Sequence, residues 1–275
     1  MSLAAHHAKS VLKRLGVSSL PVDPYEISQR LEIVVKEDDC EGYTGMILVV
    51  DGQALISIKS AIREHSRKRF TVSHELGHYC IPEHLAGGLT FYKCTDRDLD
   101  TFDKRGNKES EANEFAAELL MPEEIFKERI RLKDLSFGLI EELTGEFETS
   151  LKATGIRFVK LSDGHALVCS ENSFIKWFVK GDGFPFYVKE DRKLDGESIA
   201  IEFFRGKTIP KTFVPVPADA WLDDYKLKDG TEIQELSIPL PYYNQVLSFL
   251  YAEASEDDEE EEYLEELDGY PKFRR

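Results

Sequence analysis

The sequence has few cysteines, and they lack the spacing of metal-binding or disulfide-bonded pairs. Four cysteines occur in 275 residues, at positions 40, 80, 94 and 169, with no CxxC pair among them. This scatter indicates reduced thiols and argues against a disulfide framework or a four-cysteine metal site. We therefore expect free cysteines that form no cross-link.

Long apolar segments are also absent. No run is long enough to span a bilayer, so we expect no membrane partner. Residues 1–9 pass directly into an amphipathic helical pattern, without the apolar centre of a signal peptide. The sequence therefore predicts a cytoplasmic protein.

An excess of positive charge is missing as well. The net charge is −17, and residues 253–275 hold eleven acidic and three basic residues, which accounts for −8 of it. The remaining −9 is spread over the rest of the chain, which leaves no general basic surface for DNA. Direct binding of nucleic acid is therefore not expected.

Periodicity and turn residues divide the chain into three expected parts. Residues 1–161 combine helical segments with short apolar runs, and residues 123–161 continue as a helical segment. Residues 162–252 hold short strand-like segments and indicate a small β-rich domain of unknown role. Residues 253–275 are expected to form a disordered acidic tail, because they cannot bury apolar surface. The predicted fold class is α+β.

Individual elements follow from the same signals. Helices are expected over residues 3–15, 24–31, 69–78, 108–120, 136–143 and 150–161. Strands are expected over residues 33–35, 46–50, 54–58, 165–169, 174–179, 184–188, 199–204 and 213–216. Residues 82–104 are expected to form a loop, and residues 242–251 could form a final helix or strand.

The motif His74-Glu75-Leu76-Gly77-His78 carries the strongest chemical signal. Residues four apart lie on one face of a helix, so His74 and His78 can bind the same metal ion. Zn2+ suits two imidazoles and a carboxylate, with one position open for water and substrate. Glu75 can then act as the general base towards that water. The alternative is a surface helix with two solvated histidines. Cys80 does not share the helix face of His74, so we expect it to pack in the interior.

One candidate for the third ligand is His84, six residues after His78. This is the spacing of the metzincin motif HExxHxxGxxH. The glycine of that motif lets the chain leave the helix sharply, but Ile81 stands in its place here and resists a left-handed turn.

The other candidate is Glu109, a carboxylate on a second helix, as in gluzincins. Asn113 lies four residues later on the same face and could hydrogen-bond a ligand histidine. Glu111 points about 200° away around the helix, which makes it the poorer choice. Judged by spacing alone, however, Glu109 is best interpreted as a solvated helix carboxylate.

Two motifs resemble those of the ImmA/IrrE family of metallo-endopeptidases. Residues 67–78, RKRFTVSHELGH, resemble the family signature. Residues 109–122 resemble its second motif, a Glu four residues before Asn or Asp and then an FAAxLLMP-like run. Residues 21–24 and 43–46 also fit, so the resemblance covers about residues 5–160. It implies a minimal zincin-like peptidase core with a small sheet and a helical appendage.

The resemblance also implies the roles of residues in a gluzincin-like zinc site. His74, His78 and Glu109 match the ligand positions, Glu75 matches the catalytic position, and Asn113 supports a ligand histidine. The family also implies a helix-turn-helix-like segment after the core, which residues 137–161 resemble. Because this segment is acidic here, we expect it to pack or to bind a partner rather than DNA.

Members of this family act in the cytoplasm by cutting one repressor. We therefore expect a zinc endopeptidase that hydrolyses a helix-turn-helix transcriptional repressor in a stress or mobile-element response. A strand near residues 45–50 could hold the substrate, and His165 and Tyr92 are guesses for stabilising the oxyanion. The alternative is a metal-binding sensor or adaptor with little or no proteolytic activity.

Overall fold

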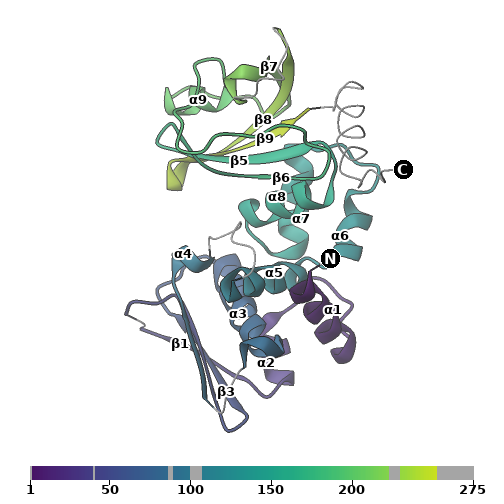
Figure 1. The fold of residues 1–275 in the computed structure, drawn as a ribbon, viewed down its shortest axis with the longest axis vertical. Helices are drawn as coiled ribbons and strands as arrows, with labels where there is room; N and C mark the ends of the chain where they lie inside the picture. Colours follow the sequence, from purple (N-terminus) through teal and green to yellow (C-terminus); the bar gives the residue numbers. More distant parts are fainter. Residues whose placement is uncertain (1, 40, 86–88, 100–106, 223–229, 253–275) are drawn as a thin grey trace, which may run out of the picture. The chain divides into compact units, whose positions relative to one another are not determined.

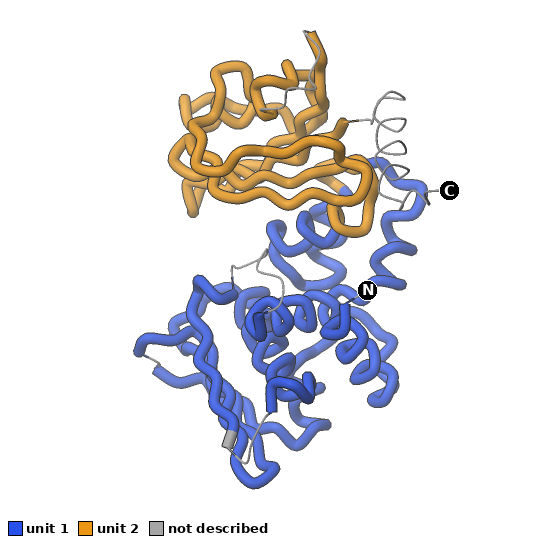
Figure 2. Tube along the Cα trace, in the orientation of Figure 1, with its two compact units in different colours: residues 1–134, 139–157 blue, residues 135–138, 158–275 orange. Residues whose placement is uncertain are grey.

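The computed structural model describes residues 2–39, 41–85, 89–99, 107–222 and 230–252. It divides into two compact units (Figure 2). Unit 1 comprises residues 1–134 and 139–157, and unit 2 comprises residues 135–138 and 158–275. No helix within the described ranges is long and apolar enough to cross a membrane.

Unit 1 begins with two helices whose ends are fixed by the sequence around them. Helix α1 (Leu3–Leu15) starts at Ser2, whose side-chain oxygen accepts from Ala5 N at 3.2 Å, and it ends at Gly16 with φ 63°. Helix α2 (Pro24–Arg30) starts at Asp23, whose Oδ1 accepts from Tyr25 N at 2.9 Å. A polar cap followed by proline at the first helical position favours a helix start at this point.

The sheet of unit 1 has four strands in the order β1-β3-β2-β4. They are β1 (Val34–Asp38), β2 (Gly45–Val50), β3 (Gln53–Lys59) and β4 (Leu89–Cys94). Strands β2 and β3 form a hairpin at Asp51-Gly52, where both residues have positive φ as such turns require. Because β2 lies between β3 and β4, both of its edges are paired, and β4 is an edge strand. In Figure 1 the labels β1 and β3 mark this sheet, and helices α2 and α3 lie on one side of it.

Two helices pack on each other beside this sheet. Helix α3 (His65–Cys80) contacts β2 and β3, and helix α5 (Lys108–Leu120) contacts α3 and α1. Apolar side chains of α1, α3, α5 and the sheet form one buried cluster that includes Val72, Leu76 and Phe115. Two short elements, η1 (Pro82–His84) and α4 (Asp96–Leu99), flank β4.

Three helices follow: α6 (Glu123–Ile130), α7 (Phe137–Phe147) and α8 (Leu151–Leu161). The ion pair between Arg157 on α8 and the buried Glu118 on α5 links the last of them to the core. Arg157 Nε also donates to Met121 O at 3.0 Å. These contacts hold the helical segment against the carboxyl end of α5 within unit 1.

Unit 2 contains a five-stranded antiparallel sheet in the order β6-β5-β9-β8-β7. Its strands are β5 (His165–Glu171), β6 (Phe174–Lys180), β7 (Val214–Pro217), β8 (Glu232–Leu240) and β9 (Gln245–Tyr251). Two further 3-10 turns, η2 (Ala218–Ala220) and η3 (Pro241–Tyr243), lie beside these strands. Helix α9 (Ile199–Phe204) packs against β8, and the buried Trp221 belongs to the core between them.

The predicted α+β class is confirmed, but several elements differ from the predictions. The interpretation of residues 82–104 as a loop is wrong, because β4 and α4 lie within it. Residues 184–188 are not a strand, β8 is an additional one, and residues 199–204 form α9 rather than a strand. The segment 242–251 resolves into the end of η3 and β9.

The helix at residues 199–204 has a non-local cause. The backbone N–H groups of Ile199 and Ala200 donate to the carboxylate of Glu235 on β8, at 2.9 and 2.8 Å. A carboxylate at the first turn satisfies free N–H groups and favours a helix. The sequence near residue 199 contains no sign of this cap, because Glu235 lies 36 residues further on. The expected acidic tail, residues 253–275, lies outside the described residues, and the expected domain boundaries stay predictions.

Candidate metal centre

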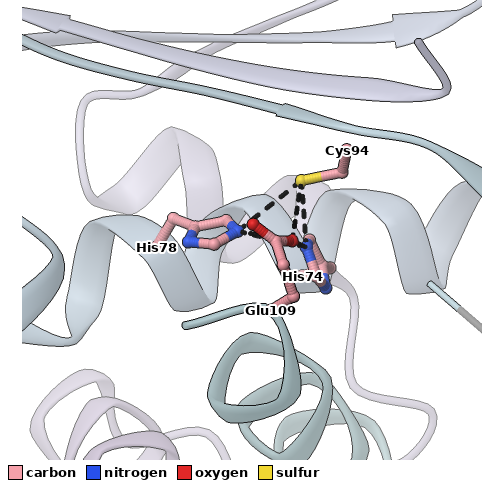
Figure 3. Close-up of side chains that lie close together, drawn as sticks. All are labelled: His74, His78, Cys94 and Glu109. Carbon is pink, nitrogen blue, oxygen red and sulfur yellow. Dashed lines mark hydrogen bonds and ion pairs between the residues drawn. The ribbon is translucent and has the colours of Figure 1, made fainter. Parts of the chain in front are cut away.

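Four side chains of unit 1 point their donor atoms at one another (Figure 3). They are His74, His78, Cys94 and Glu109, and their donor atoms all lie within 4.8 Å of one another. His74 Nε2 lies 3.1 Å from His78 Nε2 and 3.1 Å from Glu109 Oε2. His78 Nε2 lies 3.4 Å from the same carboxylate oxygen. The structure thus brings together the three residues expected as ligands, and it adds a cysteine.

The close packing of α3 on α5 creates this convergence. His74 and His78 lie one helical turn apart on α3, and Gly77 lies between them. A Cβ at Gly77 would be 3.0 Å from the Cα of Ala112 on α5, so only glycine fits without a shift of the backbone. This contact brings the first turn of α5, with Glu109, over the two imidazoles.

Asn113 fixes the orientation and the tautomer of His74. Asn113 Nδ2 donates to Asp98 O at 2.8 Å, so its Oδ1 is the atom that faces His74 Nδ1, also at 2.8 Å. An amide oxygen only accepts, so His74 Nδ1 carries the hydrogen. In the neutral ring, Nε2 then presents a lone pair to the cluster, as a metal ligand requires. The supporting position expected for Asn113 agrees with this geometry.

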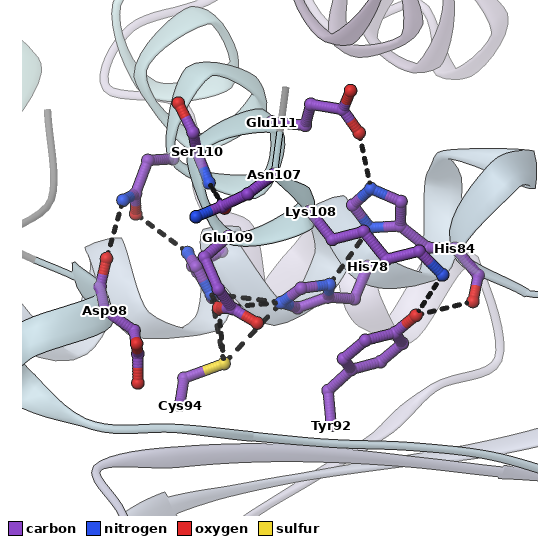
Figure 4. Close-up of polar contacts among 12 residues, drawn as sticks. His78, His84, Tyr92, Cys94, Asp98, Asn107, Lys108, Glu109, Ser110 and Glu111 are labelled. Carbon is purple, nitrogen blue, oxygen red and sulfur yellow. Dashed lines mark hydrogen bonds and ion pairs between the residues drawn. The ribbon is translucent and has the colours of Figure 1, made fainter. Parts of the chain in front are cut away.

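His84 and Glu111 fix His78 in the same way (Figure 4). Glu111 Oε2 lies 2.8 Å from His84 Nε2, and His84 Nδ1 lies 3.0 Å from His78 Nδ1. A carboxylate accepts, so His84 donates from Nε2 and accepts at Nδ1 from His78 Nδ1. His78 Nε2 is therefore also left with a lone pair directed at the cluster. The side chains of Glu111, His84 and His78 form a chain of hydrogen bonds that ends at the candidate ligand.

Tyr92 holds this chain in place from the sheet. Its ring stacks on His78, with centroids 4.2 Å apart and planes 8° from parallel. Its hydroxyl donates to His84 O at 2.9 Å and accepts from Lys108 Nζ at 2.6 Å. The guessed role of Tyr92 in stabilising an oxyanion stays a prediction. His165, the other guess, lies in unit 2, where its Nδ1 contacts Asp163 O at 2.6 Å.

Burial sets the charges at the site. It lowers the pKa of His78 to about 4, so this imidazole is neutral and available as a ligand near pH 7. Burial alone would raise the pKa of Glu109, but the contacts with His74 and His78 outweigh it and hold that pKa below its ordinary range. Two imidazoles thus face an ionised carboxylate.

Glu75 is buried beside these donors and is not one of them. Neither of its carboxylate oxygens has a hydrogen-bond partner among the described residues. Burial raises the pKa of Glu75 to about 7, against the opposing effect of His74. Such a pKa suits a group that takes up and releases a proton near neutral pH. A buried carboxylate without a partner is costly, which points to a chemical role rather than a structural one.

Gly45 at the start of β2 leaves the space that Glu75 occupies. A Cβ at Gly45 would lie 2.4 Å from Glu75 Oε1 and 2.6 Å from Thr71 Cγ2. Real atoms do not approach so closely, so any side chain at position 45 must displace the carboxylate. The first residue of β2 therefore determines the position of Glu75.

Cys94 is the site residue that the sequence interpretation missed. It is the last residue of β4, it is fully buried, and it pairs across the sheet with Gly45. Along β4, Thr90, Tyr92 and Cys94 are turned inward, whereas Phe91 and Lys93 are exposed. The residues of this strand do not alternate between apolar and polar types, since Thr90 is buried and Phe91 is exposed, so the local sequence contains no signal that places Cys94 in the site.

The other residues considered as ligands from the sequence do not belong to the group of four converging side chains. His84 lies behind His78, on the side away from the cluster, and is not one of the four converging residues. Ile81 ends α3 with φ −90°, so the chain makes no left-handed turn there. Cys80 packs against the apolar core of unit 1, as expected. Cys40 lies outside the described residues.

The donor set fits a zinc ion. Imidazole nitrogen, carboxylate oxygen and thiolate sulfur are the donors that Zn2+ takes in proteins. The two Nε2 atoms and the Glu109 carboxylate face one another, an arrangement that repels unless a proton or a metal ion lies among them. This group of residues could therefore bind a metal, and its chemistry favours zinc.

The comparisons with known proteins agree with this geometry. A family profile described as IrrE N-terminal-like domain (Peptidase_M78) matches residues 29–158. The matched range contains α3, β4 and α5, and with them every residue of the candidate site. The resemblance found in the two motifs is confirmed, and residues 29–158 belong to the ImmA/IrrE family of metallopeptidases. No curated protein shows a significant match to the chain.

The first prediction separates ligation from orientation. Glu109→Ala removes a donor and is expected to weaken zinc binding more than His84→Ala does. His84→Ala removes only the support of His78 and is expected to weaken zinc binding about 10–100-fold. Zinc titration against a competing chelator measures both, with Glu83→Ala, an exposed neighbour of His84, as the matched control. Full affinity in Glu109→Ala together with loss of binding in His84→Ala would make His84 the ligand.

The second prediction concerns the space at Gly45. Gly45→Ala should keep the metal, because no donor is removed, and should lower peptide hydrolysis roughly 100-fold by displacing the Glu75 carboxylate. Gly145→Ala on α7 is the control, since a Cβ there meets nothing within 4 Å. Unchanged hydrolysis in Gly45→Ala would show that the position of Glu75 is not critical.

Proposed function

We propose that the protein is a cytoplasmic zinc-dependent endopeptidase that cuts a specific helix-turn-helix repressor. The observation that carries the enzymatic part is the Glu75 carboxylate, buried and unpartnered, next in sequence to the donor residue His74. Membership of residues 29–158 in a metallopeptidase family supports the same reaction class.

The side chains have distinct roles in this reaction. His74, His78 and Glu109 would hold the metal, and Asn113 and His84 keep the two imidazoles in the required tautomer. Zinc, when bound at such a site, supplies the positive charge that lowers the pKa of water and polarises a carbonyl group. Glu75 accepts the proton of the attacking water on a carboxylate oxygen and delivers it to the nitrogen of the leaving amine.

The sheet offers a place for the substrate. The expectation that residues 45–50 hold it is wrong, because β2 is paired on both sides. Strand β4 is one of the two edge strands, and it carries Cys94 and Tyr92 of the site, whereas β1 carries none of the site residues. A substrate segment can add to β4 as a further strand, which selects extended polypeptide. A folded repressor would then be cut in a linker or at an exposed edge.

A repressor as the substrate is supported by the resemblance of both motifs to the ImmA/IrrE family, whose members cut repressors. A second unit beside the peptidase core also suits a regulated enzyme, since broad proteolysis in the cytoplasm would be harmful. The proposed event is cleavage of one repressor in a stress or mobile-element response.

The second candidate function is a metal-binding sensor or adaptor. It is favoured by Cys94, because four protein donors are typical of structural metal sites. The products separate the two functions: new peptide termini on a co-purifying partner indicate a peptidase, and intact partners indicate an adaptor. A Glu75→Gln variant used as a trap, with mass spectrometry of the captured proteins, identifies the partner.

The third prediction tests the role of Glu75. Glu75→Gln keeps the shape of the side chain and removes its basicity, so zinc content should stay at the wild-type value. Hydrolysis should fall about 10²–10⁴-fold. Metal analysis and cleavage assays on the same preparation measure both quantities, and His74→Ala, which should lose the metal itself, provides the contrast. Cleavage by Glu75→Gln at the wild-type rate would show that Glu75 is not the base.

The fourth prediction concerns selectivity. The zinc-loaded protein should cut the repressor encoded nearest to it at one or few sites and leave casein intact, because only an extended segment fits along β4. Sequencing of the new termini locates the cuts, and Glu75→Gln serves as the inactive control. Rapid digestion of casein with the repressor left intact would contradict the proposal.

A further inference from the structure

The four converging donors have the mutual spacing of a complete tetrahedral metal site. Cys94 Sγ lies 3.1 Å from His74 Nε2, 3.6 Å from His78 Nε2 and 3.4 Å from Glu109 Oε2. The other three separations are 3.1, 3.1 and 3.4 Å. A tetrahedral zinc site with bonds of about 2.0–2.3 Å places its donors about 3.3–3.6 Å apart. All six separations are close to that range, including the three that involve sulfur.

Hydrogen bonding does not explain why the sulfur lies there. Asn113 and His84 direct the Nε2 atoms of the two imidazoles towards the cluster, and Glu109 is an acceptor as well. The thiol of Cys94 has a single hydrogen, so it can satisfy only one of its polar neighbours, which include the Glu75 carboxylate as well as the three other donors. A buried cysteine with a purely packing role would lie among apolar groups instead. A sulfur atom surrounded by several polar acceptors has the environment of a metal ligand.

We propose that Cys94 is a fourth protein ligand of the metal. Its thiolate then occupies the coordination position that water and substrate need for peptide hydrolysis. Catalytic zinc sites have three protein ligands and an open position, whereas closed sites have four. On binding, Cys94 loses its hydrogen to solvent and forms a bond from sulfur to the metal. The reaction then requires that this sulfur first leave, so the resting enzyme is latent.

The latency of the enzyme rests on the proposed function. The fold supplies a way in which the Cys94 thiolate can be withdrawn from the metal. Cys94 terminates β4, the edge strand to which we expect the substrate to add. Substrate binding and withdrawal of the thiolate therefore act on the same strand. A correct substrate that pairs along β4 can open the site, and a peptide that does not pair leaves it closed.

The test is spectroscopic and uses the full chain reloaded with Co2+ or Zn2+. The wild type should show a thiolate-to-cobalt charge-transfer band and, by X-ray absorption of the zinc form, one sulfur neighbour at about 2.3 Å. Cys94→Ala should lose both signals and still bind metal through His74, His78 and Glu109. Cys80→Ala, on the same helix as the histidines but facing the core, should keep both. A wild-type spectrum without sulfur would overturn the proposal, whatever the stability of the variants.

Hydrolysis measured on the same samples separates this proposal from the proposed function. A faster initial rate in Cys94→Ala than in the wild type, with the sulfur signal lost, supports latency. If the wild type shows the sulfur signal and neither protein hydrolyses peptide, Cys94 is a metal ligand and the proposed peptidase function is wrong. If the wild type hydrolyses peptide without a sulfur signal, the peptidase function is supported and Cys94 is not a ligand.

Discussion

The site depends on the contact between the backbones of α3 and α5 at Gly77 and Ala112. Because a side chain at position 77 would meet the backbone of α5, the two helices approach only where glycine lies on α3. The approach brings Glu109 and Asn113 over the histidines of α3, and burial of apolar groups around Phe115 stabilises it. Without this contact the motif would be two histidines on a helix, with no carboxylate to complete a site.

That contact brings the two imidazoles and the Glu109 carboxylate together, and neighbouring side chains hold them in place. Asn113 fixes one imidazole, and the chain of His84 and Glu111 fixes the other, so both lone pairs point inward. Such preorganisation favours binding of a cation by these donors over its hydration in bulk water, because the donors need not rearrange. The uncompensated Glu75 carboxylate lies beside them, so metal binding and proton transfer are possible within one buried region.

Local sequence signals were sufficient for the helices that carry the site. The HELGH motif and the four-residue step from Glu109 to Asn113 both act within one or two helical turns. Features that depend on distant partners were missed. Cys94 reaches the site through the pairing of β4 with β2, and the first N–H groups of α9 are capped by the distant Glu235. His84 was judged as a ligand candidate, whereas its position behind His78 depends on Glu111.

The central claim is that unit 1 binds one metal ion among the donors of α3, β4 and α5. Diffraction from crystals of the zinc-loaded protein, recorded on both sides of the zinc absorption edge, tests it most directly. The account predicts a single anomalous peak within bonding distance of His74 Nε2, His78 Nε2 and Glu109. A peak at any other place, or no peak at these atoms in protein that contains stoichiometric zinc, would contradict it.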